Sequence, residues 1–216
     1  MTEGEQSGME PHSFLACVTE VARLLGIGDV AMQPTDQARH LAHAVRKPLL
    51  ERASLPDELF APLMAAAVCE PDPSFCRWFV EPAVYAFGRR RVMTALVGYL
   101  RIGTDAERAG AVRAWYSAHV PLRPDRSPAY GPGGVRDPAL DESGDIKTAW
   151  LEASMQVFAE ATDLQMRHRV LLGLPTSRAA YPPSLRTLLE STLASARIHP
   201  DVHIGRWAAA ADREGI

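Results

Sequence analysis

Three consecutive arginines in the stretch GRRRV, Arg89, Arg90 and Arg91, form the densest group of positive charge in the chain. Guanidinium groups bind carboxylates and phosphates through paired N–H donors, so this group predicts an anion site for phosphate or for an acidic protein. Residues 77–113 contain seven basic and three acidic residues. Four further arginines of this range would extend the anion site: Arg77, Arg101, Arg108 and Arg113.

A structural role for the same arginines is the alternative that we favour. Three successive positions cover most of the circumference of a helix, so the three side chains cannot share one direction. An arginine in this stretch can pair with Glu81 or Glu107 of the same chain. A nucleic-acid surface normally belongs to a basic domain, whereas this chain has an isoelectric point of about 6.2.

Residues 121–144 hold five prolines and four glycines in 24 positions, which predicts a loop or insertion. A loop of this length is unusual as a simple connector. Loops on rigid scaffolds often carry recognition, so Tyr130 and Arg136 are candidate contact residues. The glycines of YGPGGVRD lack the lysine that a phosphate-binding loop requires.

No signature of a catalytic nucleophile, a nucleotide loop or a metalloprotease occurs in the sequence. His40 and His43 are spaced to share one helix face, but no third metal ligand is spaced nearby. The cysteines Cys17, Cys69 and Cys76 lack CxxC spacing, which favours buried reduced thiols over a disulfide or a zinc site. We therefore expect no cofactor, no metal and no enzymatic activity.

The composition is that of a globular protein: 216 residues, 47% apolar and 23% charged, with a net charge of −3. No apolar run reaches the length of a membrane span. Residues 1–12 are polar and acidic, unlike a secretory signal, so we expect a flexible tail and a cytoplasmic protein that does not contact membranes.

The apolar residues recur with helical spacing along residues 13–216, and no stretch alternates as a strand does. Ser13, Asp72 and Asp201 are predicted N-caps, with Pro73 in the first turn after Asp72. TDAE at 104–107 has the pattern of a capping box. The expected fold is all-α, with about eight to ten helices stacked as antiparallel pairs in one domain.

Two heptads, DPSFCRW from Asp72 and DVHIGRW from Asp201, repeat one pattern of Asp, apolar residue, Arg and Trp. DAERAGA from Asp105 and DLQMRHR from Asp163 share the capped helix start, so the four segments are separated by 33, 58 and 38 positions. Recurrence about every 33 to 40 residues is typical of a helical solenoid. The interval of 58 is longer because it contains the insertion at 121–144. We interpret the repeated Asp, Arg and Trp as structural residues.

This pattern resembles HEAT repeats, particularly the short bacterial kind. The match is best in residues 70–120, through DPSFCRWFVEPAVYAFG, RRRVMTALVGYL and GTDAERAGAVRAWYSA. The resemblance implies a short solenoid of helix pairs with one irregular insertion, used to contact proteins or nucleic acids. It does not specify a ligand, because one fold serves many functions.

Two hypotheses of function remain. The first is a non-enzymatic interaction module or scaffold that binds a protein or peptide through the concave face of the solenoid. The second is a nucleic-acid-binding protein, related through the HEAT-like fold to DNA-repair glycosylases, in which the arginines of residues 77–113 contact backbone phosphates.

Overall fold

A computed structural model describes residues 13–28, 34–52, 54–123 and 136–214. These residues form ten α-helices and no strand, so the chain is all-α as predicted. The helices are α1 (Phe14–Leu24), α2 (Pro34–Glu51), α3 (Phe60–Cys69), α4 (Arg77–Phe87), α5 (Arg89–Ile102), α6 (Asp105–Ala118), α7 (Gly144–Glu160), α8 (Leu164–Leu172), α9 (Arg186–Arg197) and α10 (Val202–Glu214). Short 3₁₀ turns lie at η1 (Asp57–Leu59), η4 (Pro138–Leu140), η5 (Arg178–Ala180) and η6 (Pro183–Leu185).

Most of the predicted helix starts are confirmed. The Ser13 hydroxyl accepts the Ala16 amide at 3.2 Å, and Thr104 and Glu107 form the reciprocal capping box of α6. The carboxylate of Asp201 accepts two amides in the first turn of α10. Each side chain satisfies backbone N–H groups that have no partner inside the helix.

The prediction that Asp72 caps a helix beginning at Pro73 is wrong. Its carboxylate accepts the Ser74 amide at 2.8 Å within a turn, and α4 begins only at Arg77. The physical reason is that the buried Glu70 carboxylate, itself bound by Arg39 from 31 positions away, accepts the backbone N–H of Asp72 at 3.0 Å. This contact fixes the chain in a turn before the helix can start.

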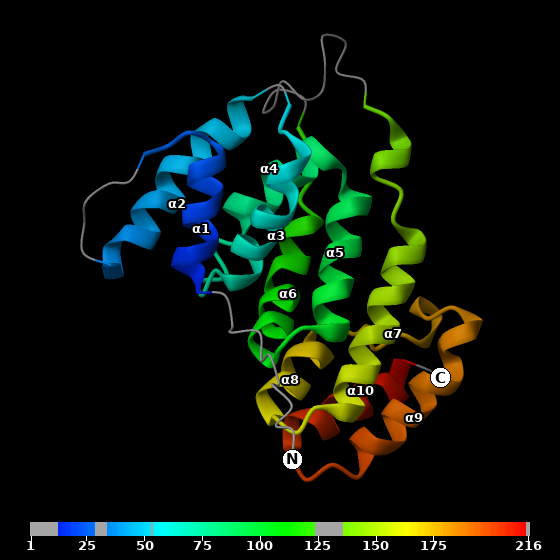
Figure 1. The fold of residues 1–216 in the computed structure, drawn as a ribbon. Coiled ribbons are helices and arrows are strands. Elements are labelled where there is room, and N and C mark those ends of the chain that lie inside the picture. The colour runs from blue at the N-terminus through cyan, green and yellow to red at the C-terminus, as the bar shows by residue number, and fades with distance from the viewer. Residues whose placement is uncertain (1–12, 29–33, 53, 124–135, 215–216) are drawn as a thin grey trace, which may run out of the picture.

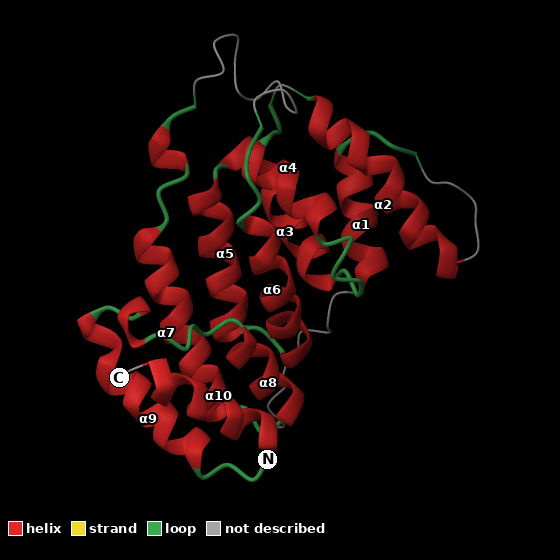
Figure 2. Cartoon of the chain, turned by 180° about the vertical axis from the view of Figure 1, so that it is seen from behind, coloured by secondary structure: helices red, strands yellow, loops and turns green. Residues whose placement is uncertain are grey.

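The helices pack in a regular order. Each helix contacts the next one within the pairs α1/α2, α3/α4, α5/α6, α7/α8 and α9/α10. The odd-numbered helices also contact one another in succession, and so do the even-numbered helices α2, α4, α6, α8 and α10. Figure 1 shows α1–α6 in the upper part of the molecule and α8–α10 in the lower part, with α7 alongside α5. The view from behind shows the same arrangement (Figure 2).

The core is continuous through these layers. Leu63 of α3, Phe79 of α4 and Leu96 of α5 are fully buried in the upper part, and Met155 and Leu193 are buried in the lower part. The two parts meet where the ring of Trp115 in α6 stacks on that of Trp150 in α7, with the ring centroids 4.0 Å apart. Burying this much apolar surface is the main favourable term in folding.

The repeated heptads pack less deeply than a core motif would require. Ile204 is fully buried as expected, but Phe75 is only partly buried. Trp78 and Trp207 are also partly buried and pack against the core from its edge. Both tryptophans therefore keep part of their surface exposed.

Helices α3 and α6 approach each other closely at Gly110. A Cβ atom added to Gly110 would overlap the backbone carbonyl of Val68, so only glycine allows this separation. Arg113, one turn further along α6, donates to the backbone carbonyl of Glu70 at 3.0 Å. The two helices are thereby fixed against each other by sterics and by a hydrogen bond.

No helix among the described residues is both long and apolar enough to cross a membrane. The predicted tail at residues 1–12 lies outside the described part of the chain, as do residues 124–135, which are half of the predicted insertion at 121–144.

Candidate functional site

The arginine group at the start of α5 splits into three directions. The Arg89 guanidinium donates to the backbone carbonyls of Ala118 and Val120, at the end of α6. Arg90 forms a bidentate ion pair with Asp145 of α7, at 2.7 and 2.5 Å. The three side chains therefore do not form one anion site.

The third arginine, Arg91, forms an ion pair with Asp57 of η1. Its guanidinium also lies 4.1 Å from the centroid of the Phe60 ring, a cation–π arrangement. The arginines hold the pKa of Asp57 and that of Asp145 below the usual range by hydrogen bonding to the ionised carboxylates. These two pairs neutralise the charge that the sequence concentrates at this helix start.

The other arginines of residues 77–113 also have partners in the same chain. Arg77 pairs with Glu81 at 3.0 Å, which is the partner expected under the structural alternative. Arg101 pairs with Glu152 of α7 at 2.8 Å. Arg108 donates to the backbone carbonyl of Arg101 at 3.1 Å, and Arg113 bonds to the turn after α3.

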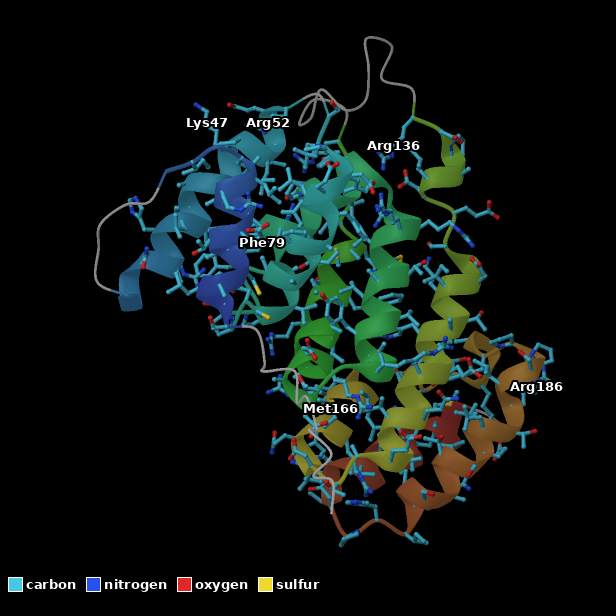
Figure 3. The ribbon with its side chains drawn as sticks, viewed as in Figure 1. Lys47, Arg52, Phe79, Arg136, Met166 and Arg186 are labelled. Atoms are coloured by element: carbon cyan, nitrogen blue, oxygen red, sulfur yellow. The ribbon has the colours of Figure 1, made fainter. Side chains whose placement is uncertain are left out.

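Arg136, one of the two candidates on the predicted insertion, is a buried structural residue. Its side chain is 7% exposed and donates to the backbone carbonyls of Val84 and Tyr85, at 2.6 and 2.5 Å. It also pairs with Asp141 at 2.9 Å. Arg136 thus binds carbonyl groups at the end of α4 (Figure 3). The other candidate, Tyr130, lies outside the described residues.

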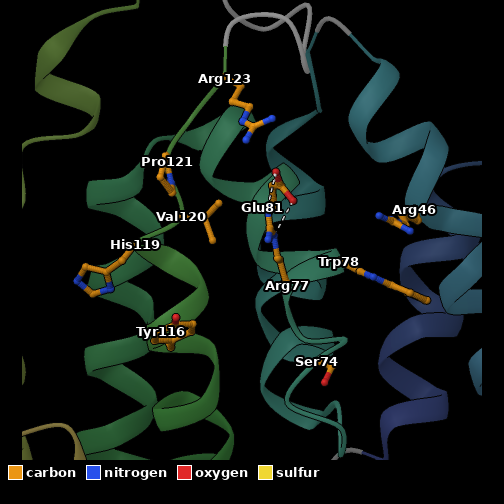
Figure 4. A pocket seen from close by; sticks show the side chains of 10 residues that line it. All are labelled: Arg46, Ser74, Arg77, Trp78, Glu81, Tyr116, His119, Val120, Pro121 and Arg123. Atoms are coloured by element: carbon orange, nitrogen blue, oxygen red, sulfur yellow. Dashed lines mark hydrogen bonds and ion pairs between the residues drawn. The ribbon is translucent and has the colours of Figure 1, made fainter.

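A groove of about 670 Å³ lies on the layer of even-numbered helices. α2 forms one wall, α6 and the segment after it form the other, and α4 lies between them (Figure 4). We call this site the α2/α6 groove. It is lined by Arg46, Ser74, Arg77, Trp78, Glu81, Tyr116, His119, Val120, Pro121 and Arg123.

Two arginines of the α2/α6 groove were not among the predicted site residues, and they differ from those in having no carboxylate or carbonyl partner for their guanidinium groups among the described residues. Arg46 and Arg123 are exposed, and neither has a carboxylate partner among the described residues. Their charges face the groove from different sides, with the Arg77–Glu81 pair between them (Figure 4). Because that pair is neutral, the groove carries an excess of positive charge.

Both of these arginines are attached to ordered parts of the fold. The Arg46 guanidinium lies 5.0 Å from the centroid of the Trp78 ring, which favours one side-chain direction. The backbone N–H of Arg123 donates to the Tyr85 hydroxyl at 2.9 Å, and this hydroxyl donates to the Arg123 carbonyl at 3.4 Å. The Arg46 guanidinium is therefore oriented before any ligand binds, and the backbone of Arg123 is fixed beside the groove.

The aromatic residues of the groove have different roles. The Trp78 ring is already in contact with His43 and Phe75, each with a centroid distance of 4.5 Å, besides Arg46. Tyr116 of α6 is 84% exposed and is available for contact. Tyrosine is enriched at protein interfaces, so Tyr116 is a candidate contact residue.

His119 is neutral near pH 7. Burial lowers its pKa, which outweighs the hydrogen bond to the carbonyl of Trp115. Because a carbonyl only accepts, Nδ1 carries the proton in this 2.9 Å bond, and Nε2 is left as an acceptor. His119 therefore adds a neutral acceptor to the groove and no positive charge.

A second hollow, of about 560 Å³, lies between α8 and α10 in the same layer of helices. Its lining is mainly apolar, through Leu171, Leu174 and Trp207, and Leu172 at its edge is 89% exposed. His168 faces it and hydrogen bonds to Asp201 at 2.8 Å, which holds the pKa of this carboxyl at about 2. We call this hollow the α8/α10 pocket.

Metal-binding chemistry has little support in the part of the chain that is described. No group of three or more His, Cys, Asp or Glu side chains there is placed to hold a metal ion. The three cysteines are free thiols, with Cys17 and Cys69 hydrogen-bonded to each other between α1 and α3. The pKa of Cys76 is raised by burial.

The sequence prediction missed Arg46, Arg123 and Tyr116. No local pattern distinguishes them, since Arg46 is 32 positions from the Trp78 ring that orients it. Comparison with protein families, with characterised proteins and with solved structures found no significant match for this chain.

Proposed function

We propose that this chain is an interaction module that binds a segment of a partner protein in the α2/α6 groove. The single observation that carries the proposal is the pair Arg46 and Arg123, which face the groove without a carboxylate partner among the described residues. Every described arginine of the predicted strip instead binds carboxylates or carbonyls of its own chain. A cleft lined by charge of one sign attracts ligands of the opposite sign, and complementary charges across an interface favour the correct partner.

We also propose that the scaffold is a short HEAT-like α-solenoid. The support is the packing order, in which each helix contacts its pair mate and the equivalent helix of the next pair. In this arrangement the even-numbered helices form one face, which we take to be the binding face. Both the α2/α6 groove and the α8/α10 pocket belong to this layer.

A protein partner accounts for the surface better than a small substrate does. The groove is open and wide, and Tyr116 projects from it with most of its ring exposed. Leu172, at the far end of the same layer, is also exposed. A partner that extends along the layer would cover both residues, whereas a small molecule would cover only one.

Site-specific cross-linking in the native cells tests this proposal. Photoreactive benzoylphenylalanine in place of Tyr116 should capture a specific protein. The matched control position is Ile102, which is 88% exposed but lies at the end of α5, in the other layer. Capture at both positions alike, or of no protein at residue 116, would contradict the proposal.

A further inference from the structure

We propose that the α2/α6 groove selects an acidic segment of its partner, with carboxylates bound by Arg46 and Arg123. This inference rests on the proposed function and adds the chemistry of the bound segment. It is carried by the charge of the groove, by two guanidinium groups that have no carboxylate partner among the described residues, and by the contacts that the Trp78 ring already makes.

The charge of the groove is complementary to carboxylates. Among the described residues of its lining, the one that is acidic is Glu81, which is already paired with Arg77 at 3.0 Å and 3.4 Å. His119 is neutral, so it does not change the balance. Arg46 and Arg123 have no carboxylate partner among the described residues, and each guanidinium can donate two N–H groups to one carboxylate.

The Glu81–Arg77 pair is an internal example of this recognition. There, a carboxylate in the groove is bound by the Nε and Nη2 atoms of one arginine. A Glu or Asp of a partner would meet Arg46 or Arg123 with the same chemistry. Because Arg46 is already stacked on Trp78, less side-chain freedom is lost when it binds.

A nucleic acid fits the groove less well, although phosphates also bind arginine. Proteins that hold single strands stack bases on exposed aromatic rings. The partly buried Trp78 ring already contacts Phe75, His43 and Arg46, which leaves less of it for a base to stack on. Tyr116 is the one strongly exposed aromatic residue in the lining, which is too few for a run of bases.

The net charge of the chain points the same way. The protein carries a net charge of −3, so it repels a long polyanion at a distance beyond the groove. A short acidic segment of a protein lies only within the groove, so it meets less of this repulsion than a long polyanion that extends over the rest of the surface.

The test is fluorescence anisotropy with a labelled glutamate-rich peptide at about 50 mM and about 300 mM salt. The full chain should bind this peptide, and higher salt should weaken the binding. Arg46→Glu and Arg123→Glu should each weaken it about tenfold or more, because each removes an ion pair and adds a repulsion. Arg186→Glu is the matched control, since Arg186 is also exposed but lies at the other end of the molecule (Figure 3).

Three outcomes would overturn the inference. The first is no binding of the acidic peptide at low salt, and the second is equal binding of a peptide in which lysine replaces every glutamate. The third is tighter, Arg46-dependent binding of a single-stranded oligonucleotide. The first two leave the proposed function standing if benzoylphenylalanine at position 116 still captures a protein, so the two failures are distinguishable.

Discussion

The start of α5 and the α2/α6 groove both concentrate arginine, yet the two regions use it in opposite ways. At the start of α5, Arg89, Arg90 and Arg91 are bound by carbonyls and carboxylates of three other segments. In the groove, Arg46 and Arg123 have no carboxylate partner among the described residues. The difference shows that the density of arginine along a sequence marks structure here, and that the unneutralised arginines mark the candidate site.

The largest effect should come from the buried carboxylate beneath the groove. Glu70 is fully buried, and its carboxylate accepts hydrogen bonds from both Nη atoms of Arg39 in α2, at 2.9 and 2.7 Å. Glu70→Ala leaves Arg39 without its partner and should lower the free energy of unfolding by about 4 kcal/mol. Urea denaturation measures the loss. A loss no larger than that of a surface substitution would mean that the groove walls are not joined through Glu70.

The next largest effect concerns the region near the start of α5. Arg136→Ala removes the donors to the carbonyls of Val84 and Tyr85 and the partner of Asp141. We expect a loss of about 3 kcal/mol in the free energy of unfolding, since the groups left behind are partly buried. Arg123→Ala is the control, an exposed arginine of the groove. Equal losses of unfolding free energy in Arg136→Ala and Arg123→Ala would mean that arginine has the same structural role in both regions.

A smaller effect should depend on pH. Arg91 holds the pKa of Asp57 below its ordinary value of 3.8, so their pair stabilises the fold above that pH and is lost as the pH falls through the lowered pKa. Arg91→Ala should therefore shift the urea midpoint more at about pH 7 than at about pH 2, where the contact of Arg91 with the Phe60 ring remains but the ion pair is weakened. A difference from the parent protein that persists unchanged in acid would exclude this pair as its cause.

The smallest effect on stability should come from the groove itself. Arg46→Ala and Arg123→Ala remove exposed side chains that have no carboxylate partner in the described structure, so the urea midpoint should stay close to that of the parent protein. The same variants should lose binding of the glutamate-rich peptide. A clear loss of stability would show that these arginines are structural, like those at the start of α5.

Local patterns in the sequence predicted much of the fold. Thr104 and Glu107 are three positions apart, and the capping box that they form needs no other part of the chain. The caps at Ser13 and Asp201 were predictable for the same reason. Asp72 was not, because Glu70, itself bound to Arg39 from 31 positions away, takes its amide.

The candidate site depends on contacts that no local pattern encodes. Arg136 bonds to a carbonyl 52 positions away, so its burial could not be read from the glycines and prolines around it. Arg46 looks like any exposed helix residue until α4 brings Trp78 to it. Identifying a free charge requires knowing the partners of every other charge, which only the folded chain determines.

The contact of Gly110 with the carbonyl of Val68 has a consequence for the kinetics of recognition. It leaves no space for α6 to slide along α3, so the wall that carries Tyr116 keeps its position when a ligand arrives. A receptor that needs no rearrangement binds in a single step, with an association rate set by diffusion and by charge. Stopped-flow traces should then be single-exponential, with observed rates that rise linearly with peptide concentration and never level off.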